Sequence, residues 1–392
     1  MRDGWEIMKL GEVCVIERGG SPRPIQSYLT DDPNGLNWIK IGDAVEGSKY
    51  IVSTKERIIP EGLKKTRFVH KGDFLLSNSM SFGRPYILAI DGCIHDGWLV
   101  IHDADNRFDK SFLYYYLSSK NIYAEFKRLA VGGVVNNLNS ELVRNVNVSI
   151  PPLSEQERIV EELDLLSGII EKKRQQLKEL DNLAQSIFYD MFGDPITNEK
   201  GWEVKTLGEV CTIERGGSPR PIQSYLTDSE DGINWIKIGD ATEGSKYITS
   251  TKEKIKPEGV KKSRFVHSGD FILSNSMSFG RPYILAIDGC IHDGWLVIHD
   301  KENTFDKSYL YYYLGSPSIY NEFKALAVGG VVNNLNSELV RKVKVVIPPL
   351  SLQQSFATKI EAIEKQKELV KQSLAETETL FNSRMDYYFS EE

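Results

Sequence analysis

Two segments of the sequence carry side chains that can hydrogen-bond to the edges of nucleobases. Residues 19–28 and 78–85 combine arginine, glutamine, asparagine and hydroxyl groups with glycine and proline. Arginine pairs with guanine and glutamine or asparagine with adenine, while hydroxyl groups serve either base. The alternative is ordinary turn chemistry, in which the same residue types are common. The predicted DNA-reading residues are Ser21, Arg23, Gln26, Ser27, Tyr28, Asn78, Ser79, Ser81 and Arg84.

A short basic run could contact phosphates. Lys64, Lys65 and Arg67 lie within four consecutive positions, and clustered cations neutralise phosphates even when the whole chain is acidic. A solvated loop is the alternative interpretation. Weaker candidates for DNA contact are Asp43, His95, Asp96, Asn136 and Asn137.

Motifs for catalysis are missing from the sequence. There is no GxxxxGK[ST] or GxGxxG loop, no HExxH, and no Asn/Asp-Pro-Pro-Tyr/Phe box of an amino-methyltransferase, and the histidines lack metal-ligand spacing. The four cysteines lie far apart, which predicts reduced, buried thiols rather than a zinc site. We therefore expect no catalytic site, no cofactor and no metal in this chain. A self-contained methyltransferase or nuclease is the less favoured alternative.

Composition predicts a soluble globular protein. The 392 residues are 41% hydrophobic and 26% charged, and no apolar run approaches the roughly 18 residues that span a bilayer. The first residues lack the apolar stretch of a signal peptide, so we expect a cytoplasmic protein without a membrane partner. The net charge of −7 belongs to the charged segments 154–200 and 351–392, because residues 1–153 sum to +1 and residues 201–350 to 0.

An internal duplication dominates the sequence. Residues 5–153 align with residues 202–350 at a constant offset of 197, without a gap and with about four positions in five identical. Such self-similarity predicts two copies of one structural unit. The predicted DNA-reading residues of the second copy are Ser218, Arg220, Gln223, Ser224, Tyr225, Lys261, Lys262, Arg264, Asn275, Ser276, Ser278 and Arg281.

Each copy is followed by a charged segment with an apolar heptad seam. The seam in residues 154–192 includes Leu163, Ile187 and Met191 and is interrupted at Lys173, and a similar seam follows in residues 351–389. Capping boxes beginning at Ser154 and Ser351 predict the helix starts. Each helix would span roughly 57 Å. We expect the two to pair as an antiparallel coiled coil; the alternative is that each packs on its own globule.

The globules are predicted to be α+β domains. Apolar runs separated by turn residues indicate strands at 38–41, 73–76, 86–90, 98–101 and 146–150, and helices are expected at 110–118, capped by Asp109, and at 122–129. The predicted organisation has domains at 1–153 and 201–350, helices at 154–192 and 351–392, and a linker at 193–200. A pseudo-two-fold axis would relate the two halves.

Taken together, these features resemble the DNA-specificity subunit of type I restriction-modification enzymes. The most specific element is the strand-to-helix junction at residues 150–159, Ile-Pro-Pro-Leu-Ser-Glu-Gln-Glu-Arg-Ile. The second copy departs from it, because Leu352 stands where the first has Glu155. The resemblance extends from Trp5 to the last helix. It implies two target-recognition domains that each read one part of a split DNA target, separated by two helices that set the spacing.

The resemblance also implies partners for a non-catalytic adapter. Two modification subunits would bring S-adenosylmethionine and adenine methylation, and two restriction subunits would bring an ATP- and Mg-dependent motor and nuclease. The partner of this chain itself would be double-stranded DNA.

The near-identity of the two copies predicts how the two halves of the DNA target are related. Because the predicted reading loops are the same, we expect near-identical, inverted half-sites whose separation follows the helix length. The alternative is a two-headed coiled-coil scaffold that binds proteins and not DNA, which the acidic balance favours and the basic clusters oppose.

Overall fold

The computed structural model describes residues 4–45, 47–78, 83–103, 105–130, 138–242, 244–275, 280–327 and 335–390. The chain divides into two compact units. Unit 1 comprises Met1–Lys173 with Ser373–Glu392, and unit 2 comprises Arg174–Gln372. Both long helices are therefore shared between the units, and each unit is described by itself below.

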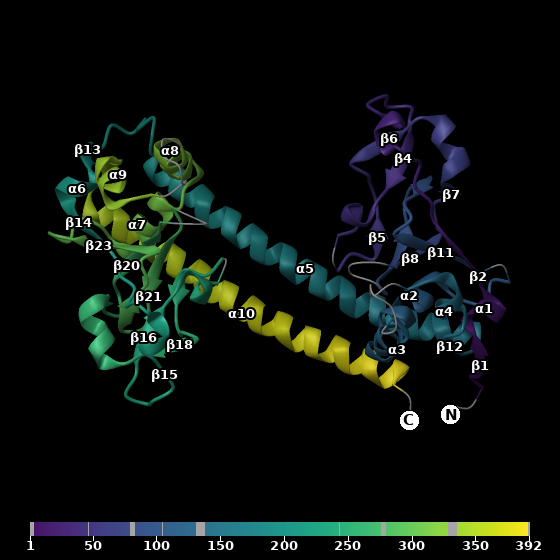
Figure 1. Cartoon of the computed structure of the whole chain (residues 1–392). Helices are drawn as coiled ribbons and strands as arrows, with labels where there is room; N and C mark the ends of the chain where they lie inside the picture. The colour runs from purple at the N-terminus through teal and green to yellow at the C-terminus, as the bar shows by residue number, and fades with distance from the viewer. Residues whose placement is uncertain are drawn as a thin grey trace. The chain divides into compact units, whose positions relative to one another are not determined.

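Unit 1 contains two five-stranded mixed sheets and a two-stranded ribbon (Figure 1). The strand orders are β3-β6-β4-β10-β7, β2-β11-β8-β9-β5 and β1-β12. The strands are β1 Glu6–Lys9, β2 Val15–Arg18, β3 Leu29–Thr30, β4 Leu36–Ile39, β5 Tyr50–Ile51, β6 Glu56–Ile58, β7 Arg67–Val69, β8 Phe74–Ser77, β9 Pro85–Leu88, β10 Gly92–Ile94, β11 Trp98–His102 and β12 Asn147–Ile150.

The central strands of unit 1 are buried on both faces. Along β8, Phe74 and Leu76 belong to the core under the helices, whereas Leu75 belongs to the core between the sheets. Alternate residues of a strand point to opposite faces, so a strand between two cores has a continuous apolar run. The predicted strands at 73–76, 86–90, 98–101 and 146–150 are confirmed within about a residue or two. The strand predicted at 38–41 ends at Ile39, because residues Ile41–Asp43 form a 3-10 turn.

Short helices cover the sheet that contains β8. The predicted helix at 110–118 is confirmed as α2, Lys110–Ser118, and the Asp109 carboxylate accepts from the backbone N–H groups of Ser111 and Phe112. The helix predicted at 122–129 extends over Lys120–Ala130 as α3. The remaining short helices of the unit are α1 Leu10–Val13 and α4 Ser140–Arg144.

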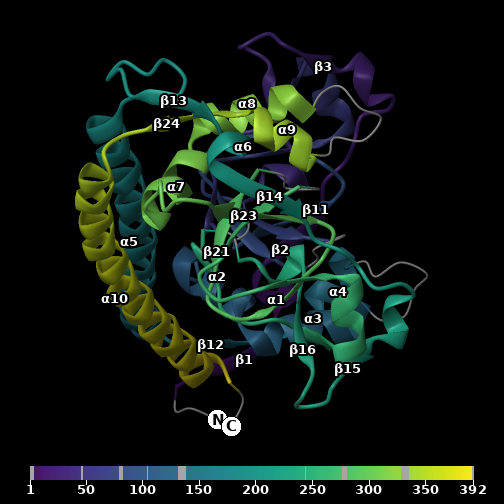
Figure 2. The ribbon, with the colours of Figure 1, turned by 90° about the vertical axis from the view of Figure 1, so that its left-hand side faces the viewer.

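Unit 2 repeats this topology with the same strand orders. Figure 2 shows β13 and β24 beside each other, close to the start of α10. Its strands are β13 Glu203–Thr206, β14 Cys211–Arg215, β15 Leu226–Thr227, β16 Ile233–Ile236, β17 Tyr247–Ile248, β18 Glu253–Ile255, β19 Arg264–Val266, β20 Phe271–Ser274, β21 Pro282–Leu285, β22 Gly289–Ile291, β23 Trp295–Asp300 and β24 Lys344–Ile347. Its short helices are α6 Leu207–Val210, α7 Lys307–Leu314, α8 Pro317–Ala327 and α9 Ser337–Lys342.

The long helices are α5, Leu153–Phe192, and α10, Leu350–Phe389. Each begins before the serine of its predicted capping box, so the predicted boxes at Ser154 and Ser351 are wrong. The junction is instead held by Gln156, which is fully buried. Its Oε1 accepts from the Asp109 N–H at 2.8 Å, and its Nε2 donates to the carbonyls of Arg107 and Pro151, both at 2.9 Å. Gln353 makes the equivalent bonds in unit 2.

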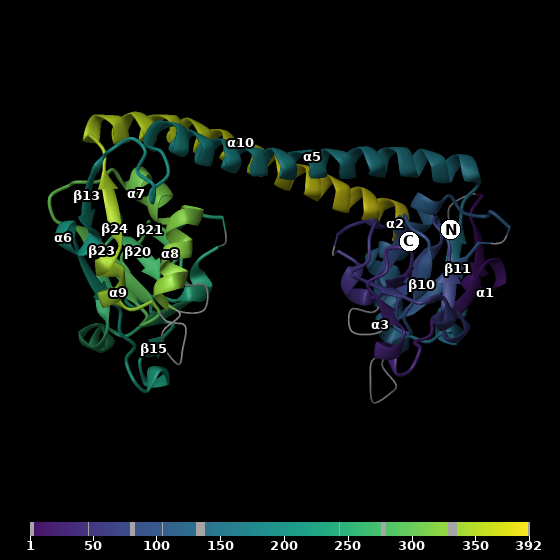
Figure 3. The same cartoon turned by 90° about the horizontal axis from the view of Figure 1, so that it is seen from above.

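Within unit 1 the two long helices run antiparallel. Glu162 of α5 accepts from Arg384 of α10 at 2.8 Å, whereas Lys173, further along α5, donates to Ser373 and Thr377, earlier in α10. Lys173 therefore interrupts the apolar seam without losing hydrogen bonds. The end of α10 lies beside α2 (Figure 3). The Phe389 ring of α10 lies 5.7 Å from the Phe112 ring of α2.

Unit 2 shows the same antiparallel order. Lys367 of α10 contacts Asp181 of α5 at 2.8 Å, and further along α5 Phe188 packs on the earlier Phe356 of α10. The predicted seam is corrected at its end, because Phe188 and Phe192 are buried in the domain core while Ile187 and Met191 are only partly buried. In each unit, therefore, the helices pair with each other and also pack on the globule, so the two alternatives weighed for the seams both hold.

The cysteines of the chain are thiols. All four cysteines are free and buried, as predicted, and burial raises the pKa of Cys14 to about 12 and that of Cys93 to about 11. Within the described ranges, no group of three or more His, Cys, Asp or Glu could hold a metal ion. Over the same residues, no helix has the length and apolar character needed to cross a bilayer.

Candidate nucleic-acid interface

Three of the predicted reading residues of unit 1, Ser21, Arg23 and Gln26, line a hollow that also contacts Trp38 of β4 and Glu56 of β6. Its volume is about 460 Å³, and we call it the loop hollow. It is lined by Ser21, Pro22, Arg23, Ile25, Gln26, Leu29, Trp38, Lys40, Glu56, His95 and Asp96. Apolar side chains with a few converging polar groups are typical of a binding site.

Two glycines bring the first loop into place. A Cβ on Gly19 would lie 2.3 Å from the carbonyl oxygen of His95, and a Cβ on Gly20 would lie 2.8 Å from that of Lys65. Any larger residue would push the loop away from both segments. The glycines thus position the Arg- and Gln-bearing loop against the segment that carries His95 and Asp96.

Asp96 connects the segments that form the hollow. Its carboxylate accepts from the Ser21 hydroxyl at 2.8 Å, and its Oδ2 lies 3.9 Å from the Arg23 guanidinium. Its backbone carbonyl accepts from Arg18 at 2.9 Å and from Asn78 at 3.0 Å. Asp96, only a weaker candidate from the sequence, therefore links β2, both predicted reading loops and the turn before β11.

His95 is held in one tautomer. Its Nδ1 accepts from the Gly97 N–H at 3.0 Å, so in the neutral ring the proton lies on Nε2, which is 3.0 Å from Asp96 Oδ1. The ring also contacts that of Trp38 edge-on at 5.8 Å. The geometry makes His95 a support for Asp96 rather than a free donor.

Unit 2 repeats this network. Asp293 accepts from Ser218 at 2.8 Å and lies 3.8 Å from the guanidinium groups of both Arg215 and Arg220. Burial raises the pKa of Asp293, but the Ser218 hydrogen bond and the nearby cationic groups outweigh it, so the pKa lies below its ordinary value. Burial lowers the pKa of His292, against the effect of Asp293. An ionised aspartate beside a neutral histidine is the resulting state near neutral pH.

The side chains best placed to contact DNA are those exposed at the first loop. The Arg23 and Arg220 side chains are each 84% exposed. Gln26 and Ser27 are exposed as well. Tyr28 is half-buried, and its hydroxyl accepts from Lys65 at 2.7 Å, as that of Tyr225 does from Lys262 at 2.6 Å. The exposed counterparts in unit 2 are Gln223 and Ser224.

The basic run is divided by the structure. Lys64 and Lys65 end the 3-10 helix Pro60–Lys65, and Lys64 is exposed with no side-chain partner among the described residues. Arg67 is paired with Glu17 at 2.7 Å and also donates to the Arg18 carbonyl. In unit 2, Lys261 is exposed and Arg264 is paired with Glu214. Lys64 and Lys261 are therefore the free cations of each run.

Of the second predicted loop, the structure describes residues 78 and 83–85 in unit 1 and 275 and 280–282 in unit 2. Asn78 and Asn275 are buried. Asn78 donates to the backbone carbonyl of Asp96, and Asn275 to that of Asp293, so neither side chain is available to a base. Arg84 is half-buried and Arg281 is exposed. Outside the described residues lie Ser79, Ser81, Asn136, Asn137, Ser276 and Ser278. The Asp43 carboxylate accepts from the backbone N–H groups of Lys40 and Lys55, so it stabilises a turn.

Sequence reasoning missed Lys40 and Glu56, which form an ion pair on the wall of the loop hollow. Glu56 begins β6 and lies opposite Trp38 of β4 in the antiparallel register. No sequence signal marks this pairing, because register between non-adjacent segments is decided by the folded sheet. The duplication offers only an indirect hint, since Lys237 and Glu253 form the same pair.

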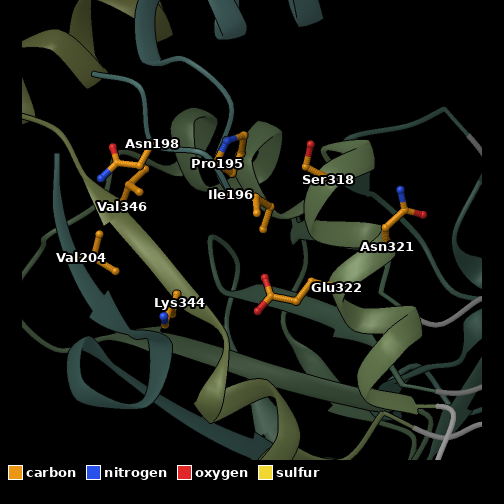
Figure 4. Close-up of a pocket in the computed structure, with 9 residues that line it drawn as sticks. All are labelled: Pro195, Ile196, Asn198, Val204, Ser318, Asn321, Glu322, Lys344 and Val346. Atoms are coloured by element: carbon orange, nitrogen blue, oxygen red, sulfur yellow. The ribbon is translucent and has the colours of Figure 1, made fainter. Parts of the chain in front are cut away.

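Unit 2 has another pocket, of about 730 Å³, on the side where β13 and β24 meet α8 (Figure 4). Its walls include Ile196 and Val346, and the Glu322 carboxylate points into it. Burial raises the pKa of Glu322. None of the predicted reading residues lines this pocket, so it is not the candidate interface.

Comparison with known proteins identifies the family to which this chain belongs. The type I restriction modification DNA specificity domain matches residues 2–182 and 199–379, which together make up most of the chain. The chain belongs to the type I restriction-modification DNA specificity family. The resemblance to this family is thereby confirmed, and so are the α+β class and the repeated domains joined by long helices.

Relatives of this family are similar over nearly the whole chain. The MjaIX specificity subunit of Methanocaldococcus jannaschii is 23% identical over 386 residues, covering 92% of this chain and 86% of that protein. A solved type I restriction-modification assembly contains a chain with a TM-score of 0.60 and 21% identity, covering 99% of this chain and 98% of that one. The S subunit of M. genitalium aligns with a TM-score of 0.54 and 14% identity, covering 99% and 96%. These structures share the fold of the specificity family.

Proposed function

We propose that this chain is the DNA-reading, non-catalytic subunit of a type I restriction-modification complex. The observation that carries the proposal is the recurrence of one exposed Arg–Gln loop, fixed by one half-buried aspartate network, in both copies of a chain that belongs to the specificity family. A rigid scaffold that holds exposed donors and acceptors in place is what recognition of base edges requires.

Two kinds of contact would supply the binding energy. The free cations Lys64 and Lys261, with Lys65 and Lys262, would neutralise phosphates and fix the position of the duplex. Arg23 and Gln26 in one unit, and Arg220 and Gln223 in the other, would discriminate bases at about 1–3 kcal/mol for each good bidentate pair.

The target we propose has two near-identical, inverted half-sites. Supporting this, the described reading residues are the same in both copies, and in each unit the domain packs on helices that run antiparallel. Identical readers on antiparallel supports would meet opposite strands of one duplex. Selection of bound DNA from a random pool by the assembled complex should enrich an interrupted palindrome, and unrelated halves would contradict the proposal.

Helix length would set the distance between the half-sites. Deleting one heptad from both α5 and α10 shortens each helix by roughly 10 Å, about three base pairs of duplex. The enriched targets of the shortened protein should show a correspondingly shorter gap. An unchanged gap would mean that the helices do not measure the target.

Partner subunits would supply the chemistry. We propose two modification subunits carrying S-adenosylmethionine, and two restriction subunits using ATP and Mg²⁺, with none of these cofactors bound by this chain. Crosslinking of labelled S-adenosylmethionine should label the modification subunit and not this chain. Labelling of the isolated chain would favour a self-contained methyltransferase.

A salt titration separates DNA binding from the scaffold alternative. A complex that neutralises several phosphates should lose DNA affinity steeply as salt rises, with a slope near −0.9 for each phosphate in a plot of log K against log salt. A protein-binding scaffold would show no such binding to duplex DNA.

A further inference from the structure

The Lys40–Glu56 ion pair has an unusual position for a structural salt bridge. It lies on the wall of the loop hollow beside Arg23, Gln26 and Trp38. The side chains are 33% and 37% exposed. Lys237 and Glu253 form the same pair in unit 2, at 32% and 38% exposure. A half-exposed ion pair contributes little to stability, so stability alone does not account for its place in both copies.

The pair offers a donor and an acceptor side by side. Within the described part of the chain, the Glu56 carboxylate has no side-chain donor other than Lys40, so one of its oxygens stays available. The Lys40 ammonium carries three N–H groups and uses one on Glu56. The neighbouring His95 directs its Nε2 toward Asp96, so it does not compete for the same ligand.

We propose, on the basis that this chain reads DNA as argued above, that each of these ion pairs reads one guanine–cytosine base pair. The lysine donates to the N7 and O6 acceptors of guanine, and the glutamate accepts from the N4 amino group of cytosine. Adenine would place its N6 donor against the ammonium where guanine has O6, and thymine O4 would face the carboxylate. The pair therefore fits guanine opposite lysine.

The surroundings support this role. Trp38, Ile25 and Leu29 give the hollow an apolar lining, and removal of water strengthens the hydrogen bonds of a charged pair. Arg23 and Gln26 lie on the same hollow, so the base pair read by Lys40 and Glu56 would lie next to those read by the loop. The half-site would consequently contain a guanine–cytosine pair flanked by bases that the loop contacts.

A charge exchange in one copy tests the proposal. In the assembled complex, the double variant Lys40→Glu with Glu56→Lys keeps an ion pair at this place but exchanges the donor and acceptor. We expect the selected DNA to invert one base pair, from guanine–cytosine to cytosine–guanine, in one half-site only. Affinity for the original half-site should fall roughly 5- to 150-fold, while the other half-site, read by Lys237 and Glu253, stays unchanged and serves as an internal control.

A matched exchange elsewhere controls for altered charge. Arg107 and Glu6 form an ion pair beside β1 whose side chains are 39% and 63% exposed, and neither lines the hollow. Exchanging them should leave both selected half-sites as they are. A second variant, Glu56→Gln, removes the charge at nearly constant size and should relax the preference at the same single position if the exchange variant fails to fold.

The experiment distinguishes failure of the ion-pair proposal from failure of the proposed function. If wild-type complex selects a bipartite target and the folded variants select the same one with equal affinity, the ion pair is not a reader. Uniform weakening on all sequences would also overturn the proposal, since that is the behaviour of a phosphate contact. A wild-type complex that selects no target would instead overturn the proposed function itself.

Discussion

The two units of this protein have the same residues around the loop hollow and different residues along the long helices. Around the loop hollow, Ser21, Arg23, Gln26, Lys40 and Asp96 all recur at an offset of 197, and the Ser–Asp hydrogen bond and the Lys–Glu ion pair recur with them. The helices share little identity. The domains are therefore nearly identical in the two copies, whereas the long helices have diverged.

A buried lysine shows how packing differs. In unit 1, Lys49 pairs with Asp164 of α5 at 2.8 Å and with the Ser111 hydroxyl at 2.7 Å. In unit 2, Lys246 keeps the equivalent bond to Ser308 but has no carboxylate within ion-pair distance among the described residues. Burial consequently lowers the pKa of Lys246. The same domain residue thus meets two different helix surfaces.

Two equivalent glutamates have pKa values shifted in opposite directions. Glu125 is paired with Arg128, and this hydrogen bond lowers its pKa. In the second copy Ala325 replaces that arginine, and burial raises the pKa of Glu322. Equivalent carboxylates therefore meet different surroundings in the two units: Glu125 has an arginine partner, and Glu322 has burial without one.

The largest expected effect tests whether the two strand-to-helix junctions contribute equally to the free energy of unfolding. Gln156→Ala and Gln353→Ala each remove three hydrogen bonds in a buried site, leaving an N–H group and two carbonyls unpaired. We expect each variant to lose about 2–4 kcal/mol of unfolding free energy. Denaturant unfolding measures this.

Glu157→Ala, at an exposed neighbouring position, is the control and should change stability by less than about 0.5 kcal/mol. If only one junction were sensitive, the two units would not share this support.

The next effect separates the units by what they read. The variant Arg23→Ala with Gln26→Ala should weaken binding to one half-site by roughly 5- to 150-fold, because it removes exposed groups that contact base edges. The variant Arg220→Ala with Gln223→Ala should weaken binding to the other half-site equally. Affinity is measured on two targets: in each, one half-site is scrambled and the other is left intact. Equal loss on both scrambled targets would show that the loops contribute only non-specific contacts.

A smaller effect is expected at the helix seam, where the units differ most. Lys367 is buried in unit 2 between Asp181 and Glu364, whereas the equivalent position in unit 1 is Ile170. Lys367→Ile should cost about 1–2 kcal/mol, because Asp181 is 57% exposed and stays hydrated after the change. Thermal unfolding provides the measurement, with the exposed Lys365→Ala as control. A loss above about 4 kcal/mol would mean that the polar contact is essential to the pairing.

The smallest effect concerns the two glutamates. Because the folded-state pKa of Glu322 is raised, the ionised form is disfavoured in the folded protein, and its contribution to stability falls as pH rises through that pKa. Glu125 behaves oppositely: its pKa is lowered, so its contribution is present above the ordinary pKa and is lost as pH falls through the folded value. Ala325→Arg should bring the pKa of Glu322 down toward that of Glu125, as NMR titration of the carboxyl carbons can measure. An unchanged pKa would show that burial, not the missing arginine, separates the two copies.

Much of the fold could be predicted from local patterns. The helix at 110–118 with its Asp109 cap, the strands β8, β9 and β11 and the long helices all follow from apolar spacing and turn residues. The capping boxes failed because Gln156 makes tertiary bonds that satisfy the junction, and the seam was misassigned at its end because Phe188 and Phe192 turn toward the domain core. Both errors come from contacts made across long sequence separations.

The candidate site was predictable only in part. Arg23 and Gln26 could be identified by residue type, since their side chains suit base edges and stand in a stiff Gly- and Pro-rich loop. Asn78 has the same chemistry but is buried, so its role depends on exposure that sequence does not give. Lys40 and Glu56 come together only through the β4–β6 register.

The amino-acid sequence by itself determined the duplication, the heptad-bearing helices, the family and the identity of the exposed loop residues, because these depend on residue types and on spacing along the chain. Only the tertiary structure decided that Asp96 ties the loops together, that Gln156 closes the strand-to-helix junction and that Lys40 faces Glu56. Those contacts join residues 16 to 75 positions apart, and which distant groups meet is fixed by how sheets and helices pack rather than by any local preference.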